Sequence, residues 1–263
     1  MTFRDLHKPG DPFILANAWD VGSAKVLAAL GAEAIATSSA AHAFTLGRPD
    51  GGTITRDEAL AHAQDLVAAV DVPISGDFEN GFGHDPETVA ETVRLSAEVG
   101  LAGIGIEDGA YEFELAVERI RAAASAARAL LNDFMLVARA DGIMNGHYEI
   151  DEALRRIRAF DEAGADCLYA PLPKTLSNQK AIIAATRKPV NVLVAGQYAG
   201  HSRADFAAMG AARLSLGSAL ARATQKTLYD AASAILSGGD FSTLKDALPG
   251  DVADELLEKG SRR

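Results

Sequence analysis

Short apolar segments alternate with longer amphipathic segments along almost the whole chain. Near-continuous apolar strands, each followed by a helical pattern, are typical of a parallel sheet that is covered on both faces. The predicted strands lie at 13–16, 34–36, 72–74, 102–106, 134–137, 165–169, 190–193 and 212–215. Eight such units in a chain of 263 residues predict an α/β fold, a closed (β/α)₈ TIM-type barrel rather than an open sheet.

The ends of several predicted helices are marked by residues that start or stop a helix. Thr55 and Glu58 have the spacing of a capping box, and Asp85 before Pro86 predicts another helix start. Four glycines stand where a helix should end and the next strand begin: Gly31, Gly100, Gly164 and Gly210. These signals place helices between the strands, as a barrel requires.

The sequence predicts one barrel domain, residues 1–236, followed by extra C-terminal helices in a tail, residues 237–263. No linker or low-complexity segment interrupts the first part. A Gly-Gly pair breaks the chain early in the tail, and 242–248 and 252–259 read as short helices. We expect this tail to pack on the barrel or on a neighbouring subunit.

Composition and charge narrow the classes of function. Hydrophobic residues make up 48% and charged residues 23%, which is ordinary for a globular protein. The net charge of −11 argues against nucleic acid and anionic membranes as partners, because both attract positive charge. The single cysteine, Cys167, excludes an internal disulfide. The chain shows no secretory leader pattern and no apolar run long enough to span a membrane, so we expect a cytoplasmic protein.

Polar residues gather at the predicted strand ends. In a barrel of this type the carboxyl ends of the strands converge on one mouth, where active sites are built. A solvated mouth collects polar residues without any function, but complementary acids, amides and a guanidinium favour a site. The residues at or just beyond the strand ends are Asn17, Ser38, Asp77, Glu79, Glu107, Asp108 and Arg139.

The segment from Ser75 to Gly83 carries two acids that leave a strand and enter a glycine-rich turn. Asp77 and Glu79 are two residues apart, so both can face one hard cation, and glycines let the backbone turn sharply beside it. Mg²⁺ prefers few carboxylates and keeps several waters. We therefore expect a Mg²⁺ site here, with an ordinary surface turn as the alternative.

The next two strand ends add a third acid and a base. Glu107 would complete the surroundings of the cation, and Arg139 can hold a substrate carboxylate through two parallel hydrogen bonds. The alternative for Arg139 is an ion pair with Asp141 or Asp108. Backbone N–H groups in the segment 38–40, which leaves the second strand, can bind an oxyanion.

Three motifs together resemble those of the isocitrate lyase and phosphoenolpyruvate mutase superfamily. They are Asp-x-Glu-x-Gly-Phe-Gly at 77–83, Gly-Ile-Glu-Asp at 105–108 and Ala-Arg-Ala-Asp at 138–141, each in register with a predicted strand. The resemblance runs from about Phe13 to Ala221. It implies a barrel enzyme that acts on a small 2-oxo-acid through an enolate, with Mg²⁺ as cofactor and Mn²⁺ as an alternative ion.

The resemblance also implies roles for individual residues. Asp77 would bind Mg²⁺ directly, and Glu79 and Glu107 would support the ion through water. The implied catalytic residues are Asp50, from the loop after the second strand, together with Glu107 and Arg139. The implied substrate-binding residues are Ser38, the backbone amides of Ser39 and Ala40, and Arg139, with Asn17 and Trp19 as further candidates at the mouth.

The sequence departs from the superfamily pattern in places that bear on the reaction. The Lys-Lys-Cys-Gly-His loop of the isocitrate lyases is absent after Glu107, and Cys167 lies within a predicted strand, where it is expected to be buried. The phosphonomutase histidine near the end of the sixth strand is replaced by Ala170 and Pro171. The loop 109–117 is short and would shield an enolate less from water.

We therefore expect a carbon–carbon bond lyase or decarboxylase. The alternatives are a P–C bond enzyme of the phosphonomutase or phosphonopyruvate hydrolase type, and a barrel that binds a 2-oxo-acid without turning it over. Asn191, within the seventh strand, can point into the barrel. The resemblance further implies a homo-oligomer, a dimer or tetramer, in which subunits exchange the last barrel helix.

Overall fold

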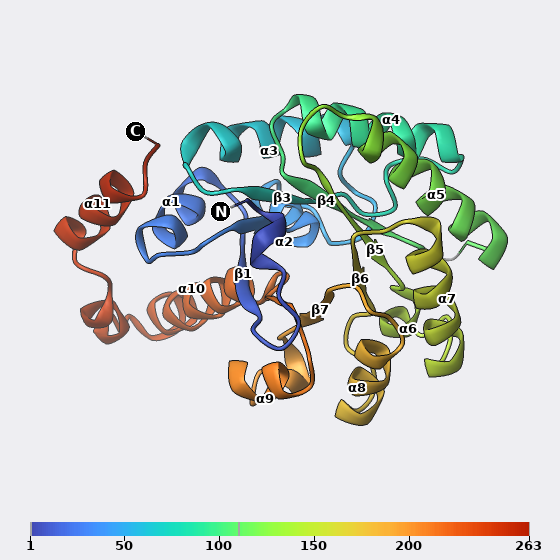
Figure 1. Ribbon diagram of the computed structural model, residues 1–263. Helices are drawn as coiled ribbons and strands as arrows, with labels where there is room; N and C mark the ends of the chain where they lie inside the picture. Colours follow the sequence, from blue (N-terminus) through green and yellow to red (C-terminus); the bar gives the residue numbers. More distant parts are fainter. Residues whose placement is uncertain (1, 110, 263) are drawn as a thin grey trace.

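The structure is a computed structural model that describes residues 2–109 and 111–262. Eight parallel strands close into a barrel in sequence order (Figure 1). They are β1 (Phe13–Ala18), β2 (Ile35–Thr37), β3 (Ile74–Asp77), β4 (Gly103–Glu107), β5 (Met135–Arg139), β6 (Cys167–Tyr169), β7 (Val190–Leu193) and β8 (Arg213–Ser215). Each strand overlaps its predicted segment, so the predicted barrel is confirmed.

Helices connect the strands and cover the outside of the barrel. The α-helices are α1 (Val21–Ala29), α2 (Ser39–Thr45), α3 (Arg56–Ala69), α4 (Pro86–Glu98), α5 (Phe113–Ala129), α6 (Gly142–Asn145), α7 (Ile150–Ala163), α8 (Leu176–Ala184), α9 (Arg203–Ala208), α10 (Ala219–Gly238) and α11 (Gly250–Lys259). The 3₁₀ helices are η1 (Arg4–Leu6), η2 (Gly196–Tyr198) and η3 (Ser242–Asp246). Among the described residues, no helix combines the length and apolar character that a bilayer crossing needs.

The predicted helix signals are confirmed by the backbone. Gly31, Gly100, Gly164 and Gly210 all adopt a positive φ, between 90° and 106°. This left-handed conformation is strained for residues with a Cβ, so glycine is the residue that ends these helices without cost. The capping box of Thr55 and Glu58 forms at the start of α3, and Asp85 caps α4 ahead of Pro86.

Three apolar clusters hold the barrel together. The largest lies between the strands and the surrounding helices and contains buried residues such as Phe160. A second lies inside the barrel, where Phe3 packs edge-on against Phe13 at the start of β1, and a third joins β7 and β8 to α9. His7 lies 3.4 Å from Arg213 at the start of β8. Residues 3–7, here called the amino-terminal plug, therefore close the end of the barrel that is opposite the strand ends.

The strand register sets five polar residues beside one another inside the barrel. Glu107 on β4 pairs with Arg139 on β5, and Arg139 pairs with Tyr169 on β6. Tyr169 then pairs with Asn191 on β7, which pairs with Arg213 on β8. Because the strands of a closed barrel are tilted and staggered, this polar row descends from the mouth, at Glu107, to the plug, at Arg213.

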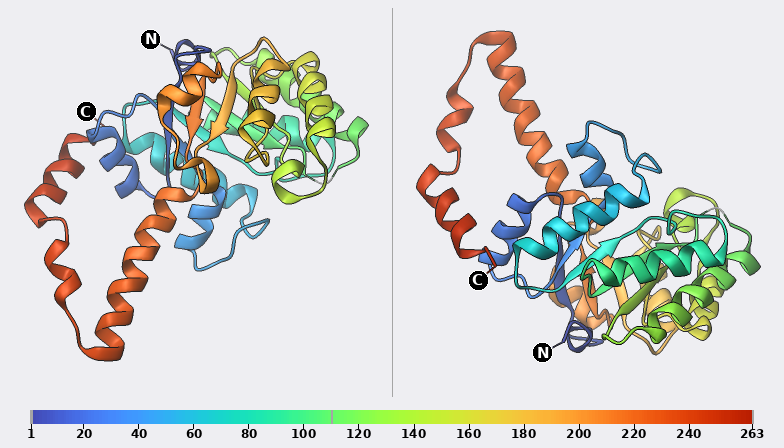
Figure 2. Two further views of the ribbon diagram at one scale, coloured as in Figure 1. Left: turned by 90° about the horizontal axis from the view of Figure 1, so that it is seen from below. Right: turned by 90° about the horizontal axis from the view of Figure 1, so that it is seen from above.

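After β8 the chain forms an arm, residues 219–259, that projects from the barrel (Figure 2). Helix α10 leaves the barrel, η3 follows it, and α11 returns to pack on α1. The predicted helices at 242–248 and 252–259 are confirmed in position, although the first is a short 3₁₀ helix and the second begins at Gly250. Helix α10 continues to Gly238, so the division of the chain at residue 236 stays a prediction.

Candidate active site at the barrel mouth

A cavity of about 840 Å³ opens at the carboxyl ends of the strands. Its wall is formed by strand-end residues from around the barrel and by the first turns of α10. A second hollow, of about 510 Å³, adjoins it between the loop that contains Asp50 and the segments after β3 and β5. Of the predicted site residues, those that line one or both spaces are Asn17, Ser38, Ser39, Ala40, Asp50, Asp77, Glu79, Glu107 and Arg139.

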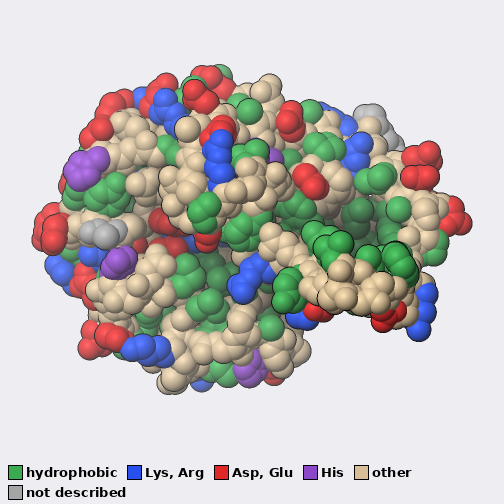
Figure 3. Space-filling view, turned by 180° about the vertical axis from the view of Figure 1, so that it is seen from behind, with side chains coloured by type: hydrophobic (Ala, Val, Ile, Leu, Met, Phe, Trp, Pro, Cys, Tyr) green, Lys and Arg blue, Asp and Glu red, His purple; other side chains and the backbone are tan. Residues whose placement is uncertain are grey.

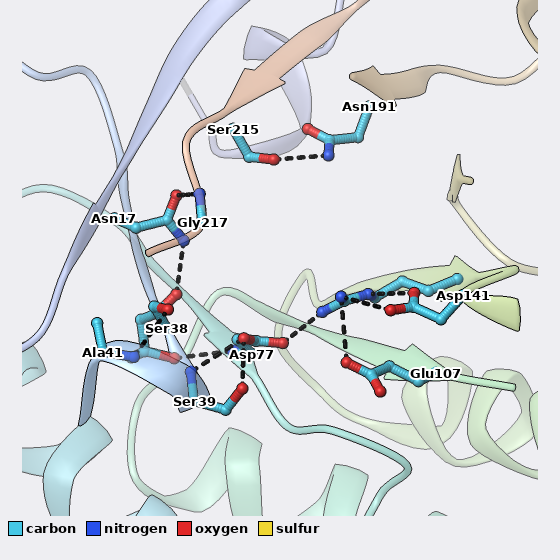
Figure 4. Close-up of polar contacts among 12 residues, drawn as sticks. Asn17, Ser38, Ser39, Ala41, Asp77, Glu107, Asp141, Asn191, Ser215 and Gly217 are labelled. Atoms are coloured by element: carbon cyan, nitrogen blue, oxygen red, sulfur yellow. Dashed lines mark hydrogen bonds and ion pairs between the residues drawn. The ribbon is translucent and has the colours of Figure 1, made fainter. Parts of the chain in front are cut away.

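Arg139 is bonded to three carboxylates at the centre of this site, those of Asp77, Glu107 and Asp141, which Figure 4 labels. Its Nε and Nη2 donate to the two oxygens of Asp141 at 2.9 Å each, and Nη2 lies 3.1 Å from Glu107 Oε1. Nη1 donates to Asp77 Oδ1. Although burial opposes the charged form, these three acids raise the pKa of Arg139 well above its usual value. The ion pair with Asp141, which was the alternative to substrate binding by Arg139, therefore forms, while the one with Asp108 does not.

Asp108 serves the site from outside the cavity. Its carboxylate is buried, accepts a 2.6 Å hydrogen bond from the Tyr148 hydroxyl, and pairs with Arg156 at 3.0 Å. It also accepts a hydrogen bond from the backbone N–H of Asp141 at 2.9 Å. Asp108 thus fixes the backbone at Asp141, whose carboxylate holds Arg139.

Asp77 is positioned by the start of α2. The backbone N–H and the hydroxyl of Ser39 donate to Asp77 Oδ2 at 3.0 and 2.9 Å. Ser38 caps the same helix by accepting from the Ala41 N–H. One of the two amides that we expected to bind substrate, that of Ser39, is therefore bonded to Asp77 here, whereas Ala40 lies in the cavity wall.

Glu79 and Glu107 are neighbours that are joined by a backbone hydrogen bond, and the charge of Glu79 acts on Glu107. The Glu79 carbonyl accepts from the Glu107 N–H at 2.8 Å, and Glu79 has a φ of 45°, which is strained for a residue with a side chain. Burial raises the pKa of Glu107 to about 8, with further contributions from Asp141 and Asp77 against the opposing effect of Arg139. Burial and the charge of Asp77 also raise the pKa of Glu79.

The donor set fits a hydrated hard cation. Among the described residues, the second hollow is lined by four carboxylates, those of Asp50, Glu79, Glu107 and Asp141, and by no basic side chain. Asp77, the expected direct ligand, lines the adjoining larger cavity instead. Within the same part of the chain, no three His, Cys, Asp or Glu side chains converge as a direct ligand set. Crowded oxygen donors without a closed cage suit Mg²⁺, which keeps several of its waters.

Asn17 and Trp19 differ in their place at the mouth. The Asn17 amide donates to the Thr37 carbonyl at 2.7 Å and accepts from the N–H groups of Leu216 and Gly217 at 2.9 and 2.8 Å. It therefore ties β1 to β2 and to the loop after β8. Trp19 is not among the residues that line the cavity, and its carbonyl bonds His62 instead.

The structure adds residues that the strand-end argument missed. Tyr169 and Ser215 line the cavity from the ends of β6 and β8, and Arg213 lines it from the start of β8. The Arg139 guanidinium lies 5.0 Å from the centre of the Tyr169 ring. Asn191 is fully buried inside the barrel, as its position in a strand allowed us to predict. Polar residues at inward positions of apolar strands were the available signal, because alternate strand residues face one side.

Comparisons with known proteins agree with this geometry. The Phosphoenolpyruvate phosphomutase family model matches residues 3–236. A crystal structure of a putative lyase/mutase from Burkholderia cenocepacia J2315 has 44% sequence identity and a TM-score of 0.92, over 97% of this chain and 93% of that chain. The 2,3-dimethylmalate lyase of Eubacterium barkeri is 33% identical over 68% of this chain and 65% of its own length. The oxaloacetate decarboxylase of Paraburkholderia xenovorans (strain LB400) is 29% identical over 95% of this chain and 85% of its own length.

Proposed function

Because the chain belongs to the isocitrate lyase and phosphoenolpyruvate mutase superfamily, we propose that it is a Mg²⁺-dependent lyase or decarboxylase acting on a small 2-oxo-acid. It is an enzyme of the carbon–carbon bond lyase type found among its relatives. The observation that carries the proposal is a guanidinium held at a fixed angle beside a hollow lined by carboxylates. This arrangement offers one positive group for a substrate carboxylate and oxygen donors for a cation.

Each residue of the site has a separate task in this reaction. Asp141 holds the Arg139 guanidinium through two hydrogen bonds, and the N–H groups that bond Asp77 and Glu107 in this structure would bind and orient the substrate carboxylate. Ser39 orients Asp77, and Glu79 and Glu107 place carboxyl oxygens in the wall of the hollow that would hold the cation. When bound, Mg²⁺ would supply Lewis-acid stabilisation of negative charge that develops on the substrate oxygens.

The cavity lining favours a lyase or decarboxylase that does not use a cysteine as its proton donor. Among the described residues, its wall contains neither histidine nor cysteine. Cys167 is fully buried within β6, and burial raises the pKa of its thiol, so it stays a neutral packing group. A proton donor of the isocitrate lyase kind is therefore not available from this residue.

We place this activity in a cytoplasmic homo-oligomer, a dimer or a tetramer. The support for an oligomer is the arm, which exposes large apolar side chains and also brings α10 residues such as Lys226 and Tyr229 into the cavity wall. The support for a reducing compartment is one free thiol, at Cys167.

The proposal is tested by titrating 2-oxo-acids into the full chain, with and without Mg²⁺, by calorimetry while pyruvate release is followed in the same samples. We expect Mg²⁺-dependent binding and release in the wild type. Asp77→Asn, which keeps the shape but removes the charge, should lower both at least tenfold. Asp57→Asn, at an exposed acid on α3, is the matched control and should change neither.

The possible results separate the alternatives. Binding that requires Mg²⁺ and Asp77 but gives no product would favour a barrel that binds without turnover, or a phosphonate substrate. Mg²⁺-independent binding, or equal effects of Asp77→Asn and Asp57→Asn, would contradict the proposed cation site. Replacing Mg²⁺ with Mn²⁺ should preserve activity, since both ions accept oxygen ligands.

A further inference from the structure

Arg213 is a buried guanidinium without an acidic partner. Arg213 is the first residue of β8 and is 5% exposed. Nε donates to Asn191 Oδ1 at 2.9 Å, and Nη1 lies 3.4 Å from His7 Nε2. Among the described residues, no carboxylate pairs with it, and the groups that act on its charge are Cys167, Tyr169 and Arg139.

Such a charge is costly in the free protein. Arginine stays protonated in proteins, and a buried charge is normally paired because it has lost its hydration. The other buried arginines of the site meet this requirement: Arg139 is bonded to three acids, and Arg156 to two. Arg119 is also buried without a carboxylate partner, but it lies outside the cavity and donates to the backbone carbonyls of Asn80 and Gly83. Among the described residues, Arg213 is the buried arginine that lines the cavity without an acidic partner, so a ligand can supply its counter-charge.

The guanidinium faces the same cavity as the catalytic site. Arg213 lines the cavity of about 840 Å³ together with Asp77 and Arg139. The cavity wall includes the small residues Ala36 on β2 and Ser75 on β3. A long side chain at either position would take up part of this cavity. The barrel interior therefore has room for the far end of a ligand.

The neighbours of Arg213 fix its direction without neutralising it. Asn191 accepts from Arg213, and its amide nitrogen donates to the Ser215 hydroxyl at 2.8 Å (Figure 4). Ser215 in turn lies near the Tyr169 hydroxyl. This chain of neutral groups runs from Arg213 up to the ring beside Arg139. It leaves the positive charge of Arg213 for a ligand and lines the path to it with hydrogen-bonding groups.

We propose that Arg213 is the binding residue for a second carboxylate, so that the site selects 2-oxo-dicarboxylates over 2-oxo-monocarboxylates. This inference rests on the proposed function, because it assigns the first carboxylate to Arg139. The substrate would extend from Arg139 and the cation at the mouth toward Arg213 along the polar row. Arg222 and Lys226 also line the cavity, but both are exposed, so water already solvates their charges.

The test compares acids that differ only in the second carboxylate. Pyruvate, 2-oxobutyrate and 2-oxovalerate are paired with oxaloacetate, 2-oxoglutarate and 2-oxoadipate, and dissociation constants are measured calorimetrically with Mg²⁺ present. We expect the wild type to bind at least one dicarboxylate about tenfold to a hundredfold more tightly than its partner, which is the range of a charge-assisted hydrogen bond. Arg213→Gln should abolish that ratio and leave the monocarboxylate unchanged.

Two further variants separate this role from a structural one. Arg213→Lys keeps the charge but loses the fork, and should retain part of the ratio. Arg222→Gln removes an exposed cation of the same cavity and should retain all of it. A ratio near one for every pair in the wild type, or a ratio lost in Arg222→Gln and kept in Arg213→Gln, would overturn the proposal. The wild-type comparison holds even if a variant fails to fold.

Oxalate distinguishes this failure from failure of the proposed function. This two-carbon dianion is too short to reach beyond the mouth, so its Mg²⁺-dependent binding reports on Asp77 and Arg139 alone. Oxalate bound equally by wild type and Arg213→Gln, with no dicarboxylate preference, would refute the Arg213 site and leave the mouth site intact. Loss of oxalate binding in Arg213→Gln would show that Arg213 supports the mouth rather than binding a second carboxylate. No oxalate binding by the wild type would refute the proposed function.

Discussion

Arg139 is bonded to Asp77, Glu107 and Asp141, and Glu107 and Asp141 also line the hollow proposed for the cation. The guanidinium therefore balances part of the negative charge that the site would otherwise carry. Only the pair with Asp141 uses two hydrogen bonds to one carboxylate. We expect this pair to persist when substrate binds, whereas the contacts with Asp77 and Glu107 are the ones that a cation and a substrate can share.

His7 makes the stability of the protein depend on pH. Burial lowers its pKa to about 3, and the positive charges of Arg213 and Arg4 add to this effect. An unfolded histidine titrates near pH 6.5, so the unfolded chain binds a proton that the native state refuses. The native state is thus fully favoured above pH 6.5 and loses stability as the pH falls toward 3. For one such group the loss is about 2 kcal/mol at pH 5.

The measurement is urea unfolding of wild type and His7→Gln at pH 7.5 and pH 5. Between these two values His7→Gln should lose about 2 kcal/mol less than the wild type. Burial also lowers the pKa of His62, to about 4, so a residual loss should remain in the variant. Identical pH dependence of the two proteins would show that His7 binds its proton as readily in the native state as in the unfolded chain.

At the scale of the element, the helix ends offer a matched pair of glycines. Gly31 ends α1 with a φ of 92°, and no atom lies within 4 Å of the place that a Cβ would take, so Gly31→Ala tests backbone strain alone. We expect it to destabilise the protein by about 1 kcal/mol. Gly238, in the last turn of α10, also has open space around it but no positive φ. Gly238→Ala should stabilise by up to about 1 kcal/mol.

Thermal and urea unfolding of the two variants checks this pair. The same added methyl group is expected to lower the free energy of unfolding at Gly31 and to raise it at Gly238, because only the backbone conformation differs. A destabilisation by both, or by neither, would mean that contacts of the new side chain outweigh the backbone.

The strands and the mouth residues could be predicted because their signals are local. A buried strand is a run of apolar residues, and a polar residue such as Asp77 or Glu107 at its end marks the mouth. The polar row could not be predicted in the same way. It depends on the stagger between strands, which places Arg213, at the start of β8, in the cavity of Asp77, at the end of β3. Stagger is a property of the closed sheet and has no local sequence pattern.

At the scale of the whole molecule, the arm exposes apolar side chains that a monomer would leave in water. Hydrophobic side chains gather over this projecting part in Figure 3. The large exposed ones on the arm are Leu228, Tyr229, Leu236, Phe241, Leu244, Leu248 and Val252. A patch of this kind marks a surface that another chain covers. A second copy of this chain is the proposed occupant.

Light scattering after gel filtration should therefore show a dimer or a tetramer. The double variant Leu228→Glu with Leu236→Glu should shift the mass toward the monomer, because each charge would be buried in the interface. Leu131→Glu is the matched control, since Leu131 is also fully exposed but lies after α5, away from the arm. A monomeric wild type would contradict the proposed oligomer. An equal effect of Leu131→Glu would show that the arm does not form the interface.

The amino-terminal plug has a consequence for how the protein is made. His7 leaves the ribosome early, but its contact on β8 is 206 residues further along the chain. At about 5–20 residues per second, roughly 10–40 s pass between the synthesis of the amino-terminal plug and that of β8, the last strand of the barrel. During this interval Phe3 and Phe13 have no closed interior to enter, and a nascent chain that stalls before Arg213 keeps them accessible to chaperones and proteases. Burial of the amino-terminal plug thus depends on the synthesis of β8.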